Sequence, residues 1–414
     1  MATKSSRVDK LGYRIRYGGS TCDDKELKAI IESASESIIS GGWQAGREVT
    51  LMEKEASKFL GVKYGILTTS GSCAGLLALS ALELPRGSEV IISAVTFPTI
   101  FNIILQCGLT PVVVDAKIGT YNFDVDEVDK AITKKTRAII AIHALGNPVD
   151  MPKLMKVAKK HNVYVMEDGC DVWGTTINGK PAMSFGDISI TSFHAAHIVS
   201  MGVGGGVFTN DAKLAERVRQ YRDWGRLANT NEPHKVEELP ADYNPRFVYD
   251  KIGYNFQILE LQAAMGRVQL KKAKKIKQLR KKNFDYLYKH LSKFDDLIMP
   301  EWLPNADICW FAFPLTVKDD RGSLTTHLEK NGIETRSMFA GNVTKHPMCA
   351  NIEYRLGSKL TQADIILKKS LWISCHPRLT QDDREYIVET FRKFYENKRK
   401  STKGLQVTQK MGRK

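Results

Sequence analysis

The chain has 414 residues, of which 43% are hydrophobic and 26% charged, and its formal net charge is +15. This composition predicts a folded protein with one large and one smaller domain, and it excludes collagen-like, disulfide-scaffold and generally disordered chains. No apolar run approaches the roughly 20 residues of a membrane span, and residues 1–16 lack an apolar signal core. We therefore expect a cytoplasmic protein.

The cysteines and the excess positive charge give no specific function. The seven cysteines are scattered, without a CxxC pair or zinc-ligand spacing, so we expect reduced thiols and no metal site. Much of the positive charge lies in 271–282 and 398–414. We interpret it as a lysine-rich helix face and a solvated tail rather than a nucleic-acid footprint, although an anionic small substrate would benefit from the same field.

The first half of the chain alternates between two kinds of apolar pattern. Helical spacing over 24–40 and 48–60 predicts two helices around a Gly-rich turn. Short apolar runs then alternate with helix-like segments such as 73–82 and 150–160. The runs lie at 64–67, 89–93, 111–115, 138–142, 164–167, 188–191 and 206–209. This alternation predicts an α/β fold with a mainly parallel sheet flanked by helices on both faces.

The second half predicts a helix from 210 to about 222, a polar loop over 227–242 and a long helix over about 258–292. Mixed strands and helices follow. We expect four units along the chain: an N-terminal extension (1–20), a large domain with N-terminal helices (21–290), a small C-terminal α/β domain (295–397) and a basic, disordered tail (398–414).

Polar residues follow several predicted strands, where ligands bind in open α/β sheets. Residues 68–74 read TTSGSCA and precede a helix, so their backbone N–H groups suit a phosphate, although an ordinary capped helix fits equally well. Residues 167–171 read EDGCD and place acidic groups at the same edge, where a surface turn is the ordinary alternative. Residues 192–206 carry SFHAAH and a Gly-rich stretch.

The order of these motifs resembles the DegT/DnrJ/EryC1/StrS sugar aminotransferase superfamily over nearly the whole chain. The motifs are SG(S/T)xA at 70–74, Thr96-Phe97, Glu167-Asp168, SFxxxH at 192–197, and Gly253-Tyr254-Asn255 before 262–264. Further segments at 145–147, 222–226, 335–336 and 339–342 are most similar to the nucleotide-4-keto-6-deoxyhexose 3-dehydratases, notably the CDP-4-keto-6-deoxyglucose 3-dehydrase. The resemblance implies a fold-type I pyridoxal phosphate (PLP) enzyme and a homodimer with shared active sites.

The resemblance also implies roles for individual residues. Asp168 would pair with the pyridine nitrogen of the cofactor, and Phe97 would stack on its ring. The cofactor phosphate would be held by Ser72, Cys73 and Ser192, with Asn255 reaching in from a partner subunit. Ordinary alternatives are a core aromatic for Phe97 and a strand-end hydroxyl for Ser192. Candidate substrate contacts are Trp43, His143, Asn147, Arg336, Phe339 and Asn342.

His197 stands where aminotransferases of the superfamily carry the lysine that binds the cofactor covalently. Imidazole cannot form that Schiff base, so the resemblance implies noncovalent PLP or pyridoxamine phosphate (PMP). Histidine keeps acid/base capacity near neutral pH. The hypothesis is that the PMP amine condenses with a C4 ketone, His197 removes a proton from the cofactor methylene carbon, and the C3 hydroxyl is expelled.

The sequence departs from the resemblance at several positions. The CDP-sugar dehydrase carries a two-iron cluster on four cysteines; Cys170 fits the first, but 227–242 contain none, so we expect no iron-sulfur cluster. Glutamate then becomes the expected amino donor that regenerates PMP, as in the cluster-free GDP-4-keto-6-deoxymannose 3-dehydratase. Val203, Ala195 and Gln257 replace a usual glutamate, proline and basic residue, and the last change bears on the amino donor.

The sequence therefore predicts a carbon-oxygen lyase, a PMP/PLP-dependent 3-dehydratase that acts on a nucleotide-linked 4-keto-6-deoxyhexose in deoxysugar and lipopolysaccharide O-antigen biosynthesis. An aminotransferase-like enzyme with another outcome, such as epimerisation, is the first alternative. A catalytically silent, cofactor-binding homologue is the second. The sequence does not specify the nucleotide.

Overall fold

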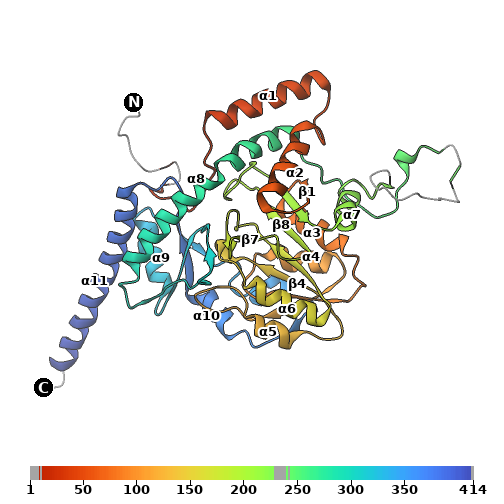
Figure 1. The fold of residues 1–414 in the computed structure, drawn as a ribbon. Helices are drawn as coiled ribbons and strands as arrows, with labels where there is room; N and C mark the ends of the chain where they lie inside the picture. Colours follow the sequence, from red (N-terminus) through yellow and green to blue (C-terminus); the bar gives the residue numbers. More distant parts are fainter. Residues whose placement is uncertain (1–8, 10–11, 228–238, 241–242, 412–414) are drawn as a thin grey trace.

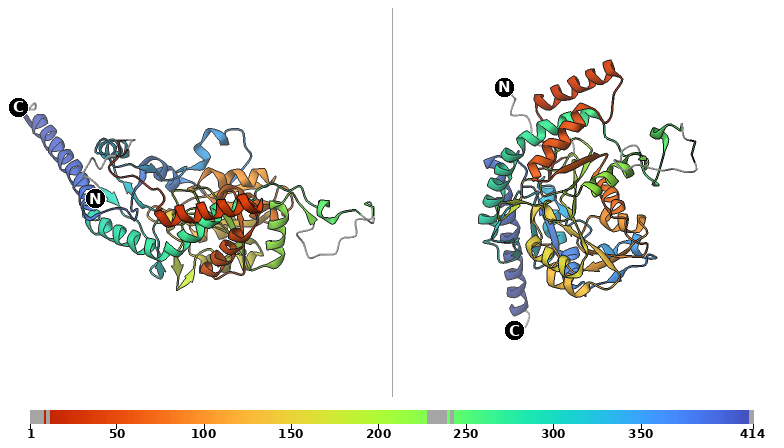
Figure 2. Two further views of the ribbon diagram at one scale, coloured as in Figure 1. Left: turned by 90° about the horizontal axis from the view of Figure 1, so that it is seen from above. Right: turned by 45° about the vertical axis from the view of Figure 1, so that its right-hand side comes forward.

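A computed structural model describes residue 9 and residues 12–227, 239–240 and 243–411 (Figures 1 and 2). The loop predicted over 227–242 therefore lies almost entirely outside the described residues. None of the helices in the described ranges combines the length and the apolar character that crossing a bilayer requires.

The large domain is built on an eight-stranded sheet in the order β1-β9-β8-β5-β4-β2-β3-β14. Its strands are β1 (Tyr64–Thr68), β2 (Glu89–Ser93), β3 (Thr110–Val114), β4 (Thr136–Ile142), β5 (Tyr164–Asp168), β8 (Ile188–Ser192), β9 (Gly205–Thr209) and β14 (Arg355–Leu356). All pairings are parallel except those of β9, which is antiparallel to both neighbours. The predicted α/β fold is confirmed, and each predicted strand is present within two residues.

Helices cover both faces of this sheet. They are α2 (Arg47–Leu60), α3 (Gly71–Ala81), α4 (Pro98–Gln106), α5 (Val125–Ala131), α6 (Met151–His161) and α7 (Ala212–Arg222). The first helix, α1 (Asp24–Ser40), lies apart from the sheet at the top of Figure 1. Side chains alternate along a strand. Accordingly Val90 and Ile92 of β2 belong to the core under α2, α3, α4 and α7, whereas Ile91 belongs to a separate core under α5 and α6.

A long helix, α8 (Glu260–Leu291), connects the large domain to the C-terminal region and runs diagonally across Figure 1. It contacts α1 and α2 near its start and α11 (Gln381–Met411) near its end. Two shorter helices follow, α9 (Arg321–Lys330) and α10 (Thr361–Lys369). A four-stranded sheet consists of β10 (Leu297–Ile298), β12 (Phe313–Val317), β15 (Ser370–Ile373) and β13 (Arg336–Ser337). A small sheet consists of β11 (Ala306–Asp307), β6 (Thr176–Ile177) and β7 (Lys180–Pro181).

A second hydrophobic core lies under the four-stranded sheet. Phe284 and Leu287 of α8, Phe313 of β12 and Phe391 of α11 are fully buried in it, together with Ile15 from the N-terminal segment. The proposed small domain therefore has a core of its own. The N-terminal extension packs against it rather than standing apart.

The tail that we predicted to be disordered from residue 398 is described as the last part of a helix. Helix α11 continues to Met411 and projects away from the rest of the molecule at the lower left of Figure 1. The segment extends a helix that already begins on the core.

A segment of the C-terminal region returns to the large domain and pairs β14 with β3. Arg355 of β14 donates from Nε to Oε1 of Glu89 at 2.7 Å and from Nη2 to Oε2 at 2.9 Å. Upstream, Ala340 donates its backbone N–H to the Thr96 carbonyl at 3.1 Å. The segment 339–357 is thus held at both ends of β2: by Glu89 at the start of the strand, and by Thr96 just after its end, at the carboxyl edge where the functional residues collect.

The Glu89 contact gives a pH-dependent test of this arrangement. Burial opposes ionisation, but hydrogen bonds from Arg355, Thr133 and Thr136 lower the pKa of Glu89 from 4.5 to about 2. The stabilisation is therefore complete above pH 4.5 and is lost as the pH falls from 4.5 towards 2. Glu89→Gln should lower the unfolding free energy at pH 7 by about 3 kcal/mol in urea titrations, with a shrinking difference below pH 4.

The matched control is Glu127→Gln, which breaks an exposed ion pair with Lys130. Exposed pairs contribute little, so the change should stay below about 1 kcal/mol. Equal effects of the two variants would contradict a special role for Glu89.

Candidate active site

One cavity of about 410 Å³ opens at the carboxyl edge of the large sheet. Its walls come from the ends of β4, β5 and β8, the starts of α3 and α4, and the residues before β9. Three aromatic side chains of the C-terminal region and Tyr17 of the N-terminal segment complete them. Seven predicted site residues line it: Ser72, Phe97, His143, Asp168, Ser192, His197 and Phe339. The topology therefore brings most of the predicted site together.

One corner of the cavity is suited to a phosphate. The first turn of α3 contributes Gly71 and Ser72, and Ser72 Oγ lies 2.7 Å from Thr99 Oγ1. A Cβ at Gly71 would lie 2.7 Å from Ser192 Cβ, so only glycine allows this close approach of helix and strand. A helix N-terminus with free N–H groups and surrounding hydroxyls favours an anion.

Asp168 supplies the negative charge in the middle of the cavity. The residue is 8% exposed, and its Oδ1 accepts the backbone N–H of Cys170 at 3.1 Å. Burial raises the pKa of the Asp168 carboxyl, and nearby Asp171 raises it further. A buried carboxyl that forms no ion pair with a lysine or arginine of the described chain fits a protonated ring nitrogen.

Phe97 stands at the rim of the same cavity. It precedes α4 and is 60% exposed, which excludes the alternative of a core aromatic. An exposed ring beside Asp168 is available to stack on a planar aromatic cofactor. The residues present therefore fit PLP or PMP in three respects: an anion corner, a carboxyl for the ring nitrogen and an aromatic face.

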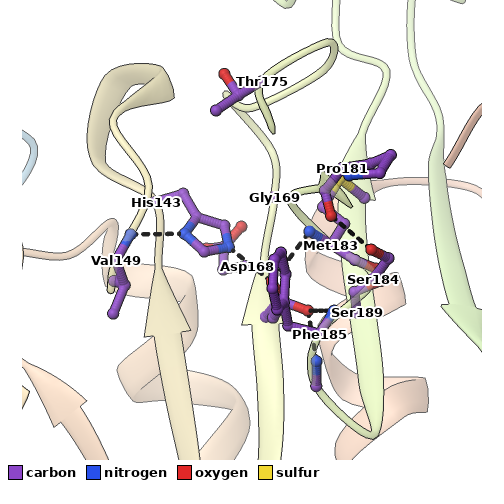
Figure 3. A network of polar contacts seen from close by, with 12 residues as sticks. His143, Val149, Asp168, Gly169, Thr175, Pro181, Met183, Ser184, Phe185 and Ser189 are labelled. Atoms are coloured by element: carbon purple, nitrogen blue, oxygen red, sulfur yellow. Dashed lines mark hydrogen bonds and ion pairs between the residues drawn. The ribbon is translucent and has the colours of Figure 1, made fainter. Parts of the chain in front are cut away.

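His143 lines the cavity with a ring whose nitrogens are both engaged (Figure 3). Nδ1 lies 3.1 Å from the Val149 N–H, which it accepts, so the proton is on Nε2, which donates to Glu167 Oε2 at 3.1 Å. Glu167 also accepts the N–H groups of Met183, Phe185 and Gly186. Both ring nitrogens of His143 are thus engaged within the protein, so the ring is a fixed part of the cavity wall rather than a free polar contact.

His197 lies on the opposite wall, in the turn that follows β8. Its ring packs against Phe311 with centroids 5.5 Å apart, and its Nδ1 lies 3.1 Å from Oδ1 of Asp171. The described lining of the cavity contains no lysine. The site therefore offers an imidazole, and no amine, as its proton-transfer group.

Two predicted substrate contacts have structural roles instead. Asn147 donates from Nδ2 to the carbonyls of Thr120 and Glu301, and Asn342 donates to Asp364 Oδ1 while its Oδ1 accepts the Thr344 N–H. Both are buried away from the cavity because backbone carbonyls and a turn use their amides. Neither residue belongs to the described lining of the cavity, so their role as substrate contacts stays a prediction from the sequence.

Four further predicted residues lie outside the cavity wall. The Cys73 N–H is donated to Ser70 Oγ as part of the α3 cap. Arg336 pairs with Glu334 and stacks over the Tyr17 ring at 4.1 Å, so it lies one side chain behind the wall. Trp43 and Asn255 are exposed on neighbouring segments, where they have no contact with the cavity of their own chain.

The structure adds residues that sequence reasoning missed: Tyr17, Thr99, Cys170, Asp171, His194, Phe311 and Trp372. Asp171 and His194 lie inside the motifs at 167–171 and 192–197, so their position next to predicted site residues could have indicated them. Burial, and then the charge of His197, lower the pKa of His194. Tyr17, Phe311 and Trp372 had no local signal, because only long-range packing brings them to the site.

The cysteine pattern is that of isolated thiols. Cys170 faces the cavity, and burial, followed by the charge of Asp168, raises the pKa of its thiol well above the ordinary value. Over the described ranges, no three His, Cys, Asp or Glu side chains are grouped to hold a metal ion. Because 228–238 lie outside those ranges, the absence of an iron-sulfur cluster stays a prediction from sequence.

The departures from the family pattern have definite surroundings. Val203 lines the cavity and is 52% exposed, so an apolar surface replaces a carboxylate there. Gln257 donates from Nε2 to Asp223 Oδ1 at 2.9 Å, in a buried cluster that also contains Arg222. Ala195 follows His194 in the turn that carries His197.

Comparison with known proteins places these features in one family. A model of the DegT/DnrJ/EryC1/StrS aminotransferase family matches residues 24–392. The chain belongs to this family. The lipopolysaccharide biosynthesis protein RfbH of Salmonella typhimurium is 37% identical over 400 residues, covering 91% of either chain. The dTDP-4-dehydro-2,6-dideoxy-D-glucose 3-dehydratase of Saccharopolyspora spinosa is 36% identical over 402 residues, covering 92% of this chain and 86% of that enzyme.

Solved structures agree with the sequence relatives. A GDP-4-keto-6-deoxymannose-3-dehydratase with a trapped PLP-glutamate geminal diamine matches with a TM-score of 0.84 and 28% identity, covering 91% of this chain and 99% of that one. PLP is thus the cofactor of a homologue with the same fold. The family includes both 3-dehydratases and aminotransferases.

The role given to Asp168 can be tested by binding alone. Asp168→Asn should weaken PLP binding to the cofactor-free protein about 100-fold or more, because a buried charge pair loses one member. A fluorescence titration with PLP measures this. Asp187→Asn is the matched control, since Asp187 is a carboxyl at the start of β8 whose pKa is also raised by burial, and it bonds the Val165 N–H. Unchanged PLP affinity in Asp168→Asn would contradict the assignment.

Proposed function

We propose that this protein is a PMP/PLP-dependent 3-dehydratase that removes the C3 hydroxyl of a nucleotide-linked 4-keto-6-deoxyhexose. The observation that carries the proposal is His197, an imidazole in the cavity lining, where the described residues include no lysine. An imidazole moves protons but does not hold the cofactor covalently. Relatives named as 3-dehydratases support the substrate class.

The cofactor, when bound, supplies an amine for a ketone substrate and a ring that accepts electrons. The protein's own residues do the rest. Asp168 keeps the ring nitrogen protonated, and the α3 corner with Ser72 and Ser192 orients the phosphate end. His197 takes up a proton at Nε2, on the cavity side of its ring. The surrounding aromatic side chains limit the access of water to these groups.

Glutamate is proposed as the amino donor that restores PMP. A homologous dehydratase binds a PLP-glutamate adduct, which supports this choice. The same adduct argues against an obligatory electron carrier, in keeping with the lack of cysteines at 227–242. Arg336 and Phe339 stay candidates for substrate contact, Phe339 at the cavity wall and Arg336 behind Tyr17.

A homodimer with shared sites is part of the proposal. Large apolar side chains are exposed at the end of α1 and on the segment before α8, including Ile39 at 87% and Ile252 at 96%. Trp43 and Asn255 lie on this same side, since Gln44 pairs with Leu259 in a β-bridge. An exposed apolar surface of this kind is typical of a protein interface. In the dimer, Asn255 of one protomer would complete the phosphate corner of the other.

Mixing two inactive variants tests the shared site. If Asn255 acts across the interface, refolding His197→Asn with Asn255→Ala at equal amounts should restore about a quarter of the wild-type active sites. The assay is product formation per protomer. Mixing His197→Asn with Asp168→Asn, which affect one and the same site, should restore nothing. No recovery in the first mixture would contradict a shared site.

The reaction itself is tested by mass spectrometry. The protein is purified with PLP and glutamate and incubated with CDP-, GDP- and dTDP-4-keto-6-deoxyhexoses. We expect one of them to lose water and keep a keto oxygen, and His197→Asn to lower the rate about 100-fold or more. His197→Lys should gain a borohydride-trappable PLP adduct that the wild type lacks. An amino product would favour the aminotransferase alternative. If the protein binds PLP but forms no product, the silent homologue is favoured.

A further inference from the structure

The turn after β5 carries two buried carboxylates, Asp168 and Asp171, three residues apart. Asp168 faces the centre of the cavity, whereas Asp171 lies beside His197, with 3.1 Å between Oδ1 and Nδ1. The Asp171 side chain is 8% exposed and the His197 side chain 17%. Two acidic groups that are close in sequence therefore face different places, the centre of the cavity and the ring of His197.

Each member of this contact lacks another partner. Nδ1 of His197 is buried, and no hydrogen bond reaches it from another group in the described part of the chain. For Asp171, the basic side chain at ion-pair distance within the described ranges is that of His197. A buried carboxylate without a cation or hydrogen-bond donor is unfavourable, so the contact stabilises both groups when the ring Nδ1 carries a proton.

We propose that Asp171 is the positioning residue of His197. It keeps the proton of the neutral imidazole on Nδ1, so that the unprotonated Nε2 faces the cavity as a base. When Nε2 takes up a proton, the Asp171 carboxylate offsets the positive charge of the ring. The chemical use of this arrangement rests on the proposed function, whereas the arrangement itself is a property of the folded protein.

The ring is 3.1 Å from the carboxylate but is turned away from a linear hydrogen bond. Contacts of this kind tighten when a substrate fills the site, and a small rotation of the imidazole is enough. Phe311 limits that rotation, because its ring packs on His197. Phe311 is itself held in place by Arg280, which donates to the Phe311 backbone carbonyl.

The remaining titratable groups near the ring are placed differently. His194 is on the same turn with its ring 6.1 Å from that of His197, and its Nδ1 accepts the Ala196 N–H. Asp168 and Cys170 line the cavity from the β5 turn, and Asp168 Oδ1 already accepts the Cys170 N–H. Asp171 is thus the carboxylate that His197 can use among the described residues.

The experiment reads the proton on the ring directly. Full-length, cofactor-free protein is labelled with ¹⁵N-histidine, and His197 is assigned by the signal lost in His197→Asn. We expect wild-type His197 to be the Nδ1–H tautomer. In Asp171→Asn the side-chain amide can donate to Nδ1, so the Nε2–H tautomer should take over.

Asp129→Asn is the matched control, because Asp129 Oδ1 contacts His161 Nε2 at 2.5 Å on the surface. It should alter the His161 signal and leave His197 unchanged. Asp171→Glu keeps the charge, so it should retain the Nδ1–H tautomer. This result would show that a loss in Asp171→Asn does not come from misfolding.

In the loaded enzyme, Asp171→Asn should lower kcat about 100-fold or more, with KM and PLP affinity within about threefold of wild type. An Nε2–H tautomer in the wild type, or identical His197 signals in Asp171→Asn, would overturn the inference. So would a variant whose main defect is PLP binding, since Asp171 would then belong to the cofactor site. If no nucleotide sugar reacts but the His197 signals respond as expected, the proposed function fails and the positioning role remains.

Discussion

A buried carboxylate at the end of β5 fixes the geometry on which the site depends. Glu167 is fully buried and accepts three backbone N–H groups from 183–186 and one ring N–H from His143. These bonds satisfy a charge that would otherwise be too costly to bury. Because side chains alternate along a strand, directing Glu167 into the protein turns Asp168 toward the cavity. One structural acid thus orients the functional one beside it.

A histidine at position 197 changes what would have to hold the proposed cofactor. In a covalent enzyme one bond retains it, whereas in the proposed enzyme several weak contacts would act together. The structure provides them as a helix N-terminus, a buried acid and an exposed aromatic ring around one cavity. The glycines support the same end, since Gly71 and Gly205 let α3, β8 and β9 approach more closely than any Cβ allows. Because the backbones are in direct contact at Gly71 and Gly205, a larger residue at either position would push these elements apart.

Much of the fold and part of the site could be predicted because they depend on local pattern. Seven strands follow from apolar runs, and the rule that ligands lie at carboxyl ends of strands points to Asp168 and Ser192. Local pattern does not report the tertiary contacts of Asn147 and Asn342. The Asn147 Nδ2 donates to a distant backbone carbonyl and the Asn342 Oδ1 accepts from a neighbouring turn, and neither residue lines the cavity. Phe311 reaches the cavity through tertiary packing, which no local pattern reports.

The N-terminal segment has a consequence for how the protein is made. Ile15 pairs with Ile333 in a β-bridge, Arg16 Nε donates to Glu334 Oε2 at 2.9 Å, and Tyr17 packs edge-on against Trp372 at 5.4 Å. The first wall residue to leave the ribosome therefore waits for partners that are synthesised more than 300 residues later. The cavity is closed only once nearly the whole chain has emerged, so a truncated nascent chain has the sheet but an unfinished site. Binding of any ligand in this cavity would then be a late event of biosynthesis, coupled to completion of the chain.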